Sequence, residues 1–175
     1  MSEIIKINFG SGPRKKEGYK NCDIRPLDGV DYVCHAKDIS AHVKHGSVSE
    51  CFSRHFLEHL TFKEAVQTLE GWRCILVNEG KIDIEVPNLE YHAAQMIEDP
   101  EGPCPIPNRG STTNMQHAMA GFYGWQNVDE HGNDWDIHKS GYTPKSLRNL
   151  LFWLGFTDIR QVQVEPWNLR MVAYK

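Results

Sequence analysis

The chain has 175 residues, of which 40% are hydrophobic and 24% are charged, and its formal net charge is −4. This composition is typical of one globular domain, and the mild negative charge without a basic stripe argues against a dedicated nucleic-acid binder. No apolar run approaches the roughly 20 residues that a membrane span requires, and the first residues lack the pattern of a signal peptide. We therefore expect a cytoplasmic protein without membrane or nucleic-acid partners. Nothing in the sequence indicates an oligomeric state.

The cysteines are scattered along the chain and contain no Cys-x-x-Cys pair. An odd, scattered set favours reduced thiols over a disulfide framework or a thiolate zinc site. The five residues are Cys22, Cys34, Cys51, Cys74 and Cys104.

The first predicted element is a strand over residues 4–9, where apolar and polar residues alternate. It stops at Gly10-Ser11-Gly12. Glycines have no Cβ, so the backbone there can approach a ligand closely. Ligands of open α/β sheets bind at the carboxyl ends of strands. We therefore expect a ligand over Gly10 and Gly12.

Two further strands are predicted over residues 19–24 and 30–36. The link at residues 13–18 has room for about one helical turn, although a parallel pair normally needs a crossover of a dozen or more residues. The strands also alternate, whereas strands covered by helices on both faces read as continuous apolar runs. We predict that one face of the sheet is only thinly covered by helices.

The middle of the chain predicts a strand, a helix and a strand. The strands cover residues 48–55 and 82–86, and the second is stopped by Pro87. Between them, Thr61-Phe62-Lys63-Glu64 is a capping box that starts a helix with apolar residues at helical spacing. Asn78-Glu79-Gly80 is a typical helix end.

Residues 89–141 differ in composition from the rest of the chain. Four prolines over residues 100–107 preclude regular structure there, and a short amphipathic helix is predicted over residues 115–123. An insertion of this length in a compact domain is typically a lid or a binding loop.

The C-terminal part is well marked. Thr143 and Pro144 start a helix that Gly155 stops. Strands over residues 157–164 and 168–174 follow, and their tight link suits an antiparallel hairpin.

This order of elements, with Gly-x-Gly after the first strand, resembles the class I S-adenosylmethionine-dependent methyltransferases, and within them the methyltransferase-11 type. The resemblance spans nearly the whole chain. It implies an α/β, Rossmann-like sheet, mostly parallel with a C-terminal antiparallel hairpin, in a single domain over residues 1–175 with the insert at about 89–141. The matching pieces are Asn8-Phe9-Gly10-Ser11-Gly12-Pro13-Arg14, Asn21-Cys22-Asp23-Ile24, Lys37-Asp38-Ile39, Phe56-Leu57-Glu58-His59-Leu60, Trp72-Arg73-x-Ile75-Leu76-x-x-x-Gly80, Val86-Pro87-Asn88 and His138-Lys139-Ser140-Gly141-Tyr142-Thr143-Pro144.

The resemblance implies S-adenosyl-L-methionine as the cofactor. Asp23 would accept hydrogen bonds from the ribose hydroxyls, Asp38 would accept from the adenine amino group, and Ile39 would cover the adenine ring. Both aspartates could instead be turn residues. Asn8 stands where this superfamily commonly has an acid. The implied cofactor-binding residues are Phe9, Gly10, Ser11, Gly12, Asp23, Asp38, Ile39, Arg54, His55 and Phe56.

The implied reaction is in-line transfer of the sulfonium methyl group to an oxygen or nitrogen of a small molecule or glycan. Holding donor and acceptor in line supplies most of the catalysis, and a base is needed only if the acceptor must lose a proton early. The candidate bases are His138 and His59, since histidine titrates near neutrality. His138 is favoured because the insert is expected to cover the side of the site where the acceptor binds. It could instead hydrogen-bond loop backbone.

Three alternatives remain. His55-Phe56-Leu57-Glu58-His59 matches the inverted zinc-protease signature His-x-x-Glu-His, which would make the protein a zinc-dependent hydrolase. That motif must lie within a helix, whereas the capping box starts the helix at Thr61, after both histidines. A nicotinamide cofactor fits less well, because Lys15 stands where the dinucleotide fingerprint has its third glycine. A non-catalytic binding protein of methyltransferase fold is the third.

A second group, His131, Asp134, Asp136 and His138, has metal-ligating residue types. Such residues are also typical of polar turns. We assign no metal site from the sequence.

Overall fold

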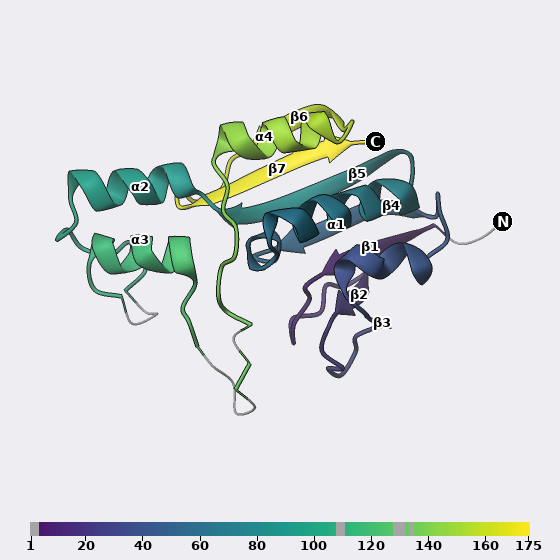
Figure 1. Ribbon diagram of the computed structural model, residues 1–175, viewed down its shortest axis with the longest axis horizontal. Coiled ribbons are helices and arrows are strands. Elements are labelled where there is room, and N and C mark those ends of the chain that lie inside the picture. Colours follow the sequence, from purple (N-terminus) through teal and green to yellow (C-terminus); the bar gives the residue numbers. More distant parts are fainter. Residues whose placement is uncertain (1–3, 108–110, 128–131, 134) are drawn as a thin grey trace.

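The computed structural model describes residues 4–107, 111–127, 132–133 and 135–175. Within these residues, seven strands form one sheet in the order β3-β2-β1-β4-β5-β7-β6 (Figure 1). Neighbouring strands from β3 to β5 are parallel, and β7 is antiparallel to both β5 and β6. The strands are β1 (Ile5–Phe9), β2 (Lys20–Asp23), β3 (Tyr32–Val33), β4 (Val48–Arg54), β5 (Leu76–Pro87), β6 (Thr157–Val162) and β7 (Asn168–Tyr174). The predicted α/β fold with its C-terminal antiparallel hairpin is confirmed.

Each α-helix of the described residues begins at a side-chain cap. The Thr61 hydroxyl accepts from the Glu64 N–H at 3.3 Å, and the Glu64 carboxylate accepts from the Thr61 N–H at 3.0 Å, so the predicted capping box is confirmed. Within the described residues, no helix is long and apolar enough to cross a membrane. The helices are η1 (Ala36–Ala41), η2 (Leu57–His59), α1 (Phe62–Ile75), α2 (Leu89–Glu98), α3 (Asn114–Tyr123) and α4 (Pro144–Trp153), where η marks a 3₁₀ helix.

The core lies between one face of the sheet and the helices α1, η1 and α4. Trp72 of α1 is fully buried and stacks on Phe9 of β1, with 4.4 Å between ring centroids. The remaining core side chains come from alternate positions of the strands and from the helix stripes, so one apolar face of each element meets the others. Fully buried members include Ile7, Ile39, Cys51, Ala65, Leu69, Ile82, Ile84, Val86, Leu147, Leu151, Met171 and Ala173.

The other face of the sheet is polar. The register places Glu50 beside Lys81 and Glu85 beside Arg170 on adjacent strands. Two nitrogens of Arg170 donate to the Asp83 carboxylate at 2.8 Å each. Bidentate, charge-assisted contacts of this kind are strong enough to hold a carboxylate at a largely buried position.

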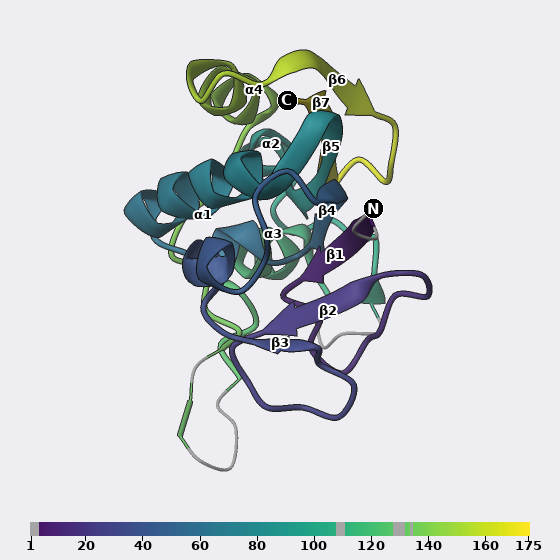
Figure 2. The same cartoon turned by 90° about the vertical axis from the view of Figure 1, so that its right-hand side faces the viewer.

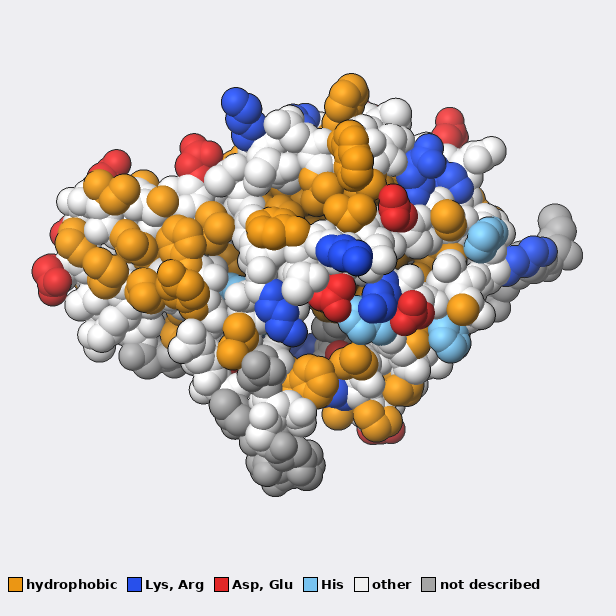
Figure 3. All heavy atoms as spheres, in the orientation of Figure 1, with side chains coloured by type: hydrophobic (Ala, Val, Ile, Leu, Met, Phe, Trp, Pro, Cys, Tyr) orange, Lys and Arg blue, Asp and Glu red, His pale blue; other side chains and the backbone are white. Residues whose placement is uncertain are grey.

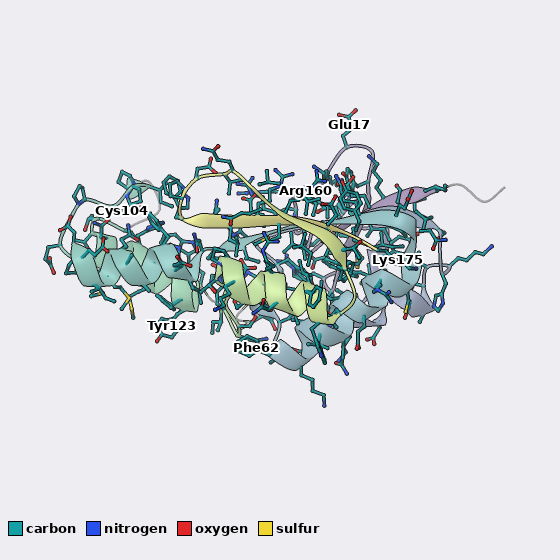
Figure 4. All side chains as sticks on the ribbon, turned by 90° about the horizontal axis from the view of Figure 1, so that it is seen from above. Glu17, Phe62, Cys104, Tyr123, Arg160 and Lys175 are labelled. Atoms are coloured by element: carbon teal, nitrogen blue, oxygen red, sulfur yellow. The ribbon has the colours of Figure 1, made fainter. Side chains whose placement is uncertain are left out.

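Loops rather than helices lie on this polar face (Figure 2). Lys16 and Tyr19, in the link from β1 to β2, fold over Phe52 of β4, with the Lys16 ammonium 4.2 Å from the Phe52 ring centroid. Seen from above, Glu17 in the same link points away from the side where Phe62 of α1 lies (Figure 4). The predicted reduction of helices on one face is confirmed.

Three boundaries differ from the sequence prediction. Helix α1 ends at Ile75 and β5 begins directly at Leu76. The β4–β5 register shifts between Val48–Leu76 and Glu50–Lys81. The expected helix end, residues 78–80, is therefore a bulge within the strand, since turn-forming residues suit either use. Strand β3 is shorter than residues 30–36 because η1 follows it.

The insert contains one unpredicted helix and one predicted helix. Helix α2 begins after Asn88, whose side chain accepts from the Glu90 N–H, and α3 matches the expected amphipathic helix over residues 115–123. Hydrophobic side chains gather over α2 and α3 on the surface in Figure 3. The exposed large hydrophobic side chains of these two helices include Ile97 and Tyr123, with 79% and 52% of their surfaces exposed.

Two buried histidines join α2 to α3. The His92 and His117 rings lie 4.9 Å apart, and His117 Nδ1 is 2.9 Å from the side-chain oxygen of Gln95. Burial lowers the pKa of His92 to about 4, and burial also lowers the pKa of His117. Both rings are therefore held in the neutral form at neutral pH.

This histidine pair predicts acid sensitivity. The folded-state pKa of His92, about 4, lies below the ordinary histidine pKa of 6.5. Between these values the unfolded chain binds a proton that the folded chain excludes, so stability falls as pH is lowered from about 6.5 toward 4, by up to about 1.4 kcal/mol per pH unit for one group. The free energy of unfolding, measured by urea denaturation at several pH values across this range, should fall less steeply with decreasing pH for His92→Leu than for wild type.

The matched control for this experiment is His42→Leu, which removes an exposed imidazole. If the free energy of unfolding changed equally with pH in wild type and in His92→Leu, this would contradict the lowered pKa of folded His92 as the cause of acid sensitivity.

Candidate active site

The carboxyl ends of β1 and β2 are tied together through a glycine turn. Gly10 and Gly12 have φ of +61° and +53°, in the left-handed region that favours glycine. The Gly12 N–H donates to Asp23 Oδ2 at 2.8 Å, and the Ser11 N–H donates to the Cys22 carbonyl at 3.2 Å. The turn after β1 is thus held in place by the tip of β2.

Asp23 is buried and fully engaged within the protein. Its carboxylate accepts from the Arg25 N–H and Nε at 3.0 Å each, and from Arg25 Nη2 at 3.3 Å, besides Gly12. Burial, the largest influence, raises the pKa of Asp23, but the hydrogen bonds from Arg25 and Gly12 outweigh it, so the pKa is lowered. A ligand hydroxyl that binds this carboxylate must therefore displace Arg25.

The two predicted adenine-binding residues lie on η1. Asp38 is exposed, and its N–H donates to the His35 carbonyl at 2.8 Å. Ile39 has no exposed surface, because its side chain packs into the core beside Gly71 of α1. The structure thus places Asp38 at the surface and Ile39 beneath it.

The end of β4 turns sharply into η2. Arg54 Nε lies 3.0 Å from Glu85 Oε1, and the next residue, His55, has φ of +48°. Phe56 then packs over the glycine turn. A Cβ added to Gly10 would lie 2.3 Å from the Phe56 ring. Phe56 and the turn are therefore in direct contact.

The two predicted bases lie next to each other, although His59 precedes the insert and His138 lies near the insert's C-terminal end. Their ring centroids are 4.9 Å apart at an interplanar angle of 74°. His59 Nδ1 is 3.1 Å from the Ile137 carbonyl, and His138 Nδ1 is 2.9 Å from the Gly121 carbonyl. His138 therefore makes the contact to loop backbone that the sequence analysis gave as the alternative to a role as base. This contact uses Nδ1 and does not involve Nε2.

Glu58 lies beside this histidine pair. It is 1% exposed, and within the described part of the chain neither carboxylate oxygen has a hydrogen-bond partner. His55 Nδ1 is the nearest ion-pair atom, at 3.4 Å. Burial, the largest influence, raises the pKa of Glu58, but His55, His59 and His138 outweigh it, so the pKa is lowered.

The backbone of Glu58 anchors the end of the insert. Its carbonyl accepts from the N–H groups of Lys139 and Ser140 at 2.8 and 3.0 Å. Tyr142, two residues on, is also buried near Glu58, and burial raises its pKa to about 12. These contacts fix where His138 lies.

The metal-ligand patterns of the sequence are rearranged in the structure. His55 and His59 precede α1, and η2 between them is a 3₁₀ turn, so the helical zinc-protease geometry is absent there. Asp136 accepts from Asn127 at 2.9 Å, while His131 and Asp134 lie outside the described residues. Sequence reasoning missed Arg25 as the partner of Asp23, and it named Glu58 only within the zinc-hydrolase alternative, not as a buried carboxylate beside His59 and His138. The sequence signal for Glu58 was the His55-x-x-Glu58-His59 spacing, in which a carboxylate stands next to one histidine and three positions after another.

No family model and no curated protein matches this chain. It is similar to solved structures, among them a SAM-dependent methyltransferase from Archaeoglobus fulgidus (15% identity, 97% of this chain and 85% of that one, TM-score 0.62). Another is the 1,6-didemethyltoxoflavin-N1-methyltransferase of Burkholderia thailandensis with bound S-adenosylhomocysteine (14%, 99% and 72%, TM-score 0.58). A third is an S-adenosylmethionine-dependent methyltransferase from Mesorhizobium loti (13%, 100% and 94%, TM-score 0.60). The chain therefore has the class I methyltransferase fold.

The contact between Gly10 and Phe56 predicts a large effect of a single methyl group. Gly18→Ala places alanine at φ of +76° with no atom within 4 Å of its Cβ, whereas Gly10→Ala adds the clash with Phe56. We expect Gly18→Ala to cost about 1 kcal/mol of unfolding free energy from the backbone alone. Gly10→Ala should cost at least about 1 kcal/mol more, from overpacking.

Urea denaturation of the two variants measures this difference. Equal losses of unfolding free energy in Gly10→Ala and Gly18→Ala would show that Phe56 does not pack tightly against Gly10.

Proposed function

We propose that this protein is a methyltransferase that uses S-adenosyl-L-methionine to methylate an oxygen or nitrogen of a small molecule or sugar. The observation that supports this most is the buried, ionised Asp23 joined to the left-handed Gly10–Gly12 turn at the carboxyl ends of β1 and β2. Ligands of open α/β sheets bind at such ends. The fold, shared with solved methyltransferases, agrees with this reading.

The cofactor would lie across the tips of β1, β2 and β4. Its methionine end and ribose would pass Phe9, Gly10, Ser11 and Gly12, where the left-handed φ of both glycines makes a tight turn at the end of β1. The ribose hydroxyls would take the place of Arg25 on the Asp23 carboxylate. Arg54, His55 and Phe56, at the end of β4, would flank the donor.

The adenine would meet η1. The exposed Asp38 carboxylate is free to face the adenine amino group, and Ile39 would contact the ring after a shift of its buried side chain. At the first strand, Asn8 stands in place of an acid and donates to Asn21 Oδ1 at 2.9 Å. The amide gives no negative charge there, so Asp23 would be the main anionic contact of the cofactor.

The acceptor would bind on the side of the insert, near His59 and His138. Each Nδ1 contacts a backbone carbonyl, which leaves Nε2 of either neutral ring as a lone-pair acceptor for a proton of the substrate. His138 is the favoured base because it sits on the insert itself. In-line alignment of donor and acceptor would supply the larger part of the rate enhancement.

The test is calorimetric titration with S-adenosylmethionine and S-adenosylhomocysteine. Wild type should bind both, and Asp23→Asn should bind roughly 10- to 150-fold more weakly, as expected for loss of a charged hydrogen-bond acceptor. Arg25→Ala should bind more tightly than wild type, because the competing guanidinium is gone.

The matched control is Asp28→Asn, which removes an exposed carboxylate paired with Lys15. Thermal unfolding of each variant checks that it folds. A folded wild-type protein that binds neither compound would overturn the proposed cofactor. Cofactor binding without turnover over a panel of acceptors would instead favour a non-catalytic binding protein.

A further inference from the structure

The buried carboxylate of Glu58 is the starting point for a second site. Both of its oxygens lack a hydrogen-bond partner among the described residues, although the side chain is 1% exposed. Burying a carboxylate is costly unless a cation or several donors compensate it. The nearest donor, His55 Nδ1 at 3.4 Å, is too distant for a good hydrogen bond.

His59 and His138 supply two nitrogens beside this carboxylate. One ligating atom from each of Glu58, His59 and His138 lies within 4.8 Å of the other two. Ligands of a tetrahedral zinc ion, at bonds of about 2.0–2.2 Å, lie roughly 3.3 Å apart. Rotation of the side chains by a modest amount would therefore close the three atoms around one ion.

The hydrogen bonds of the two rings fix which nitrogen is available. A carbonyl oxygen accepts and never donates, so the Nδ1 atoms that contact the carbonyls of Ile137 and Gly121 must carry the protons. Each neutral ring then has its lone pair on Nε2. Metal-binding histidines characteristically donate their other N–H to a carbonyl or carboxylate in this way.

We infer that Glu58, His59 and His138 bind a divalent transition-metal ion such as Zn²⁺. Two imidazoles and one carboxylate are a donor set for zinc or iron(II), with at least one coordination position left open. Mg²⁺ and Ca²⁺ prefer oxygen ligands, so they fit this set less well. His55, whose Nδ1 lies 3.4 Å from the Glu58 carboxylate, is outside this ligand set.

The site has a consequence for methyl transfer, and that consequence rests on the proposed function. A bound cation would use both Nε2 lone pairs, so neither histidine would then act as the base. The open position would instead take an oxygen of the acceptor and hold it near the donor. Metal binding itself does not depend on the cofactor.

The experiment is titration of the metal-free protein with Zn²⁺ and with Mg²⁺, in the absence of S-adenosylmethionine. Wild type should bind one Zn²⁺ per chain in preference to Mg²⁺, and Glu58→Gln and His138→Ala should each weaken zinc binding at least tenfold. The control is the double variant His42→Ala/His45→Ala, which removes two exposed surface histidines and should bind zinc as wild type does.

Visible absorption of Co²⁺ bound to wild type gives a readout that needs no variant to fold. Intense bands of a four- or five-coordinate site are expected. A weak octahedral spectrum, an absence of zinc binding, preference for Mg²⁺, or zinc binding lost only in His42→Ala/His45→Ala would overturn the inference. Separate titration with S-adenosylmethionine shows whether the proposed function stands independently.

Discussion

The stack of Trp72 on Phe9 is the contact on which the rest of the molecule depends. It joins the middle of α1 to the end of β1, with both rings fully buried. The ring centroid of Phe56 lies 6.5 Å from that of Trp72, and Phe56 packs directly against Gly10. One apolar contact thus positions the glycine turn and the start of η2, and through η2 the side chains of Glu58 and His59. The same contacts therefore determine both the packing of the core and the geometry of the site.

The sheet is stable with helices on only one face because the buried charges on its other face are paired with one another. Asp83 and Glu85 are nearly buried but face Arg170 and Arg54 on neighbouring strands. Strand register, rather than a helical layer, provides these partners. Replacing one charge of such a pair is costly because its partner is then left buried and uncompensated. The polar face therefore constrains the sequence as strongly as an apolar core does.

Local signals made much of the fold predictable. The capping box at Thr61, the cap at Thr143, the helix stripes and the strand alternation depend on neighbours in sequence, and the structure matches them. The bulge before Lys81 was missed because Asn-Glu-Gly suits a helix end equally well. The Glu58 cluster could not be read from the sequence, since it depends on contacts such as that of His59 with Ile137, 78 positions away. Arg25 was missed because ion-pair choice depends on side-chain geometry.

The short link between β1 and β2 also changes how much chain entropy the sheet must overcome. Asn8 pairs with Asn21 across only 13 positions, whereas Ser49 reaches Ile5 across 44. Loop-closure entropy grows with the logarithm of loop length, so the nearer contact costs about 1 kcal/mol less. Parallel sheets usually form slowly because their strands are distant in sequence. Here the short link brings β2 within reach of β1 at low contact order, so among the parallel strand pairs those at the β1–β2–β3 edge of the sheet form over the smallest loops.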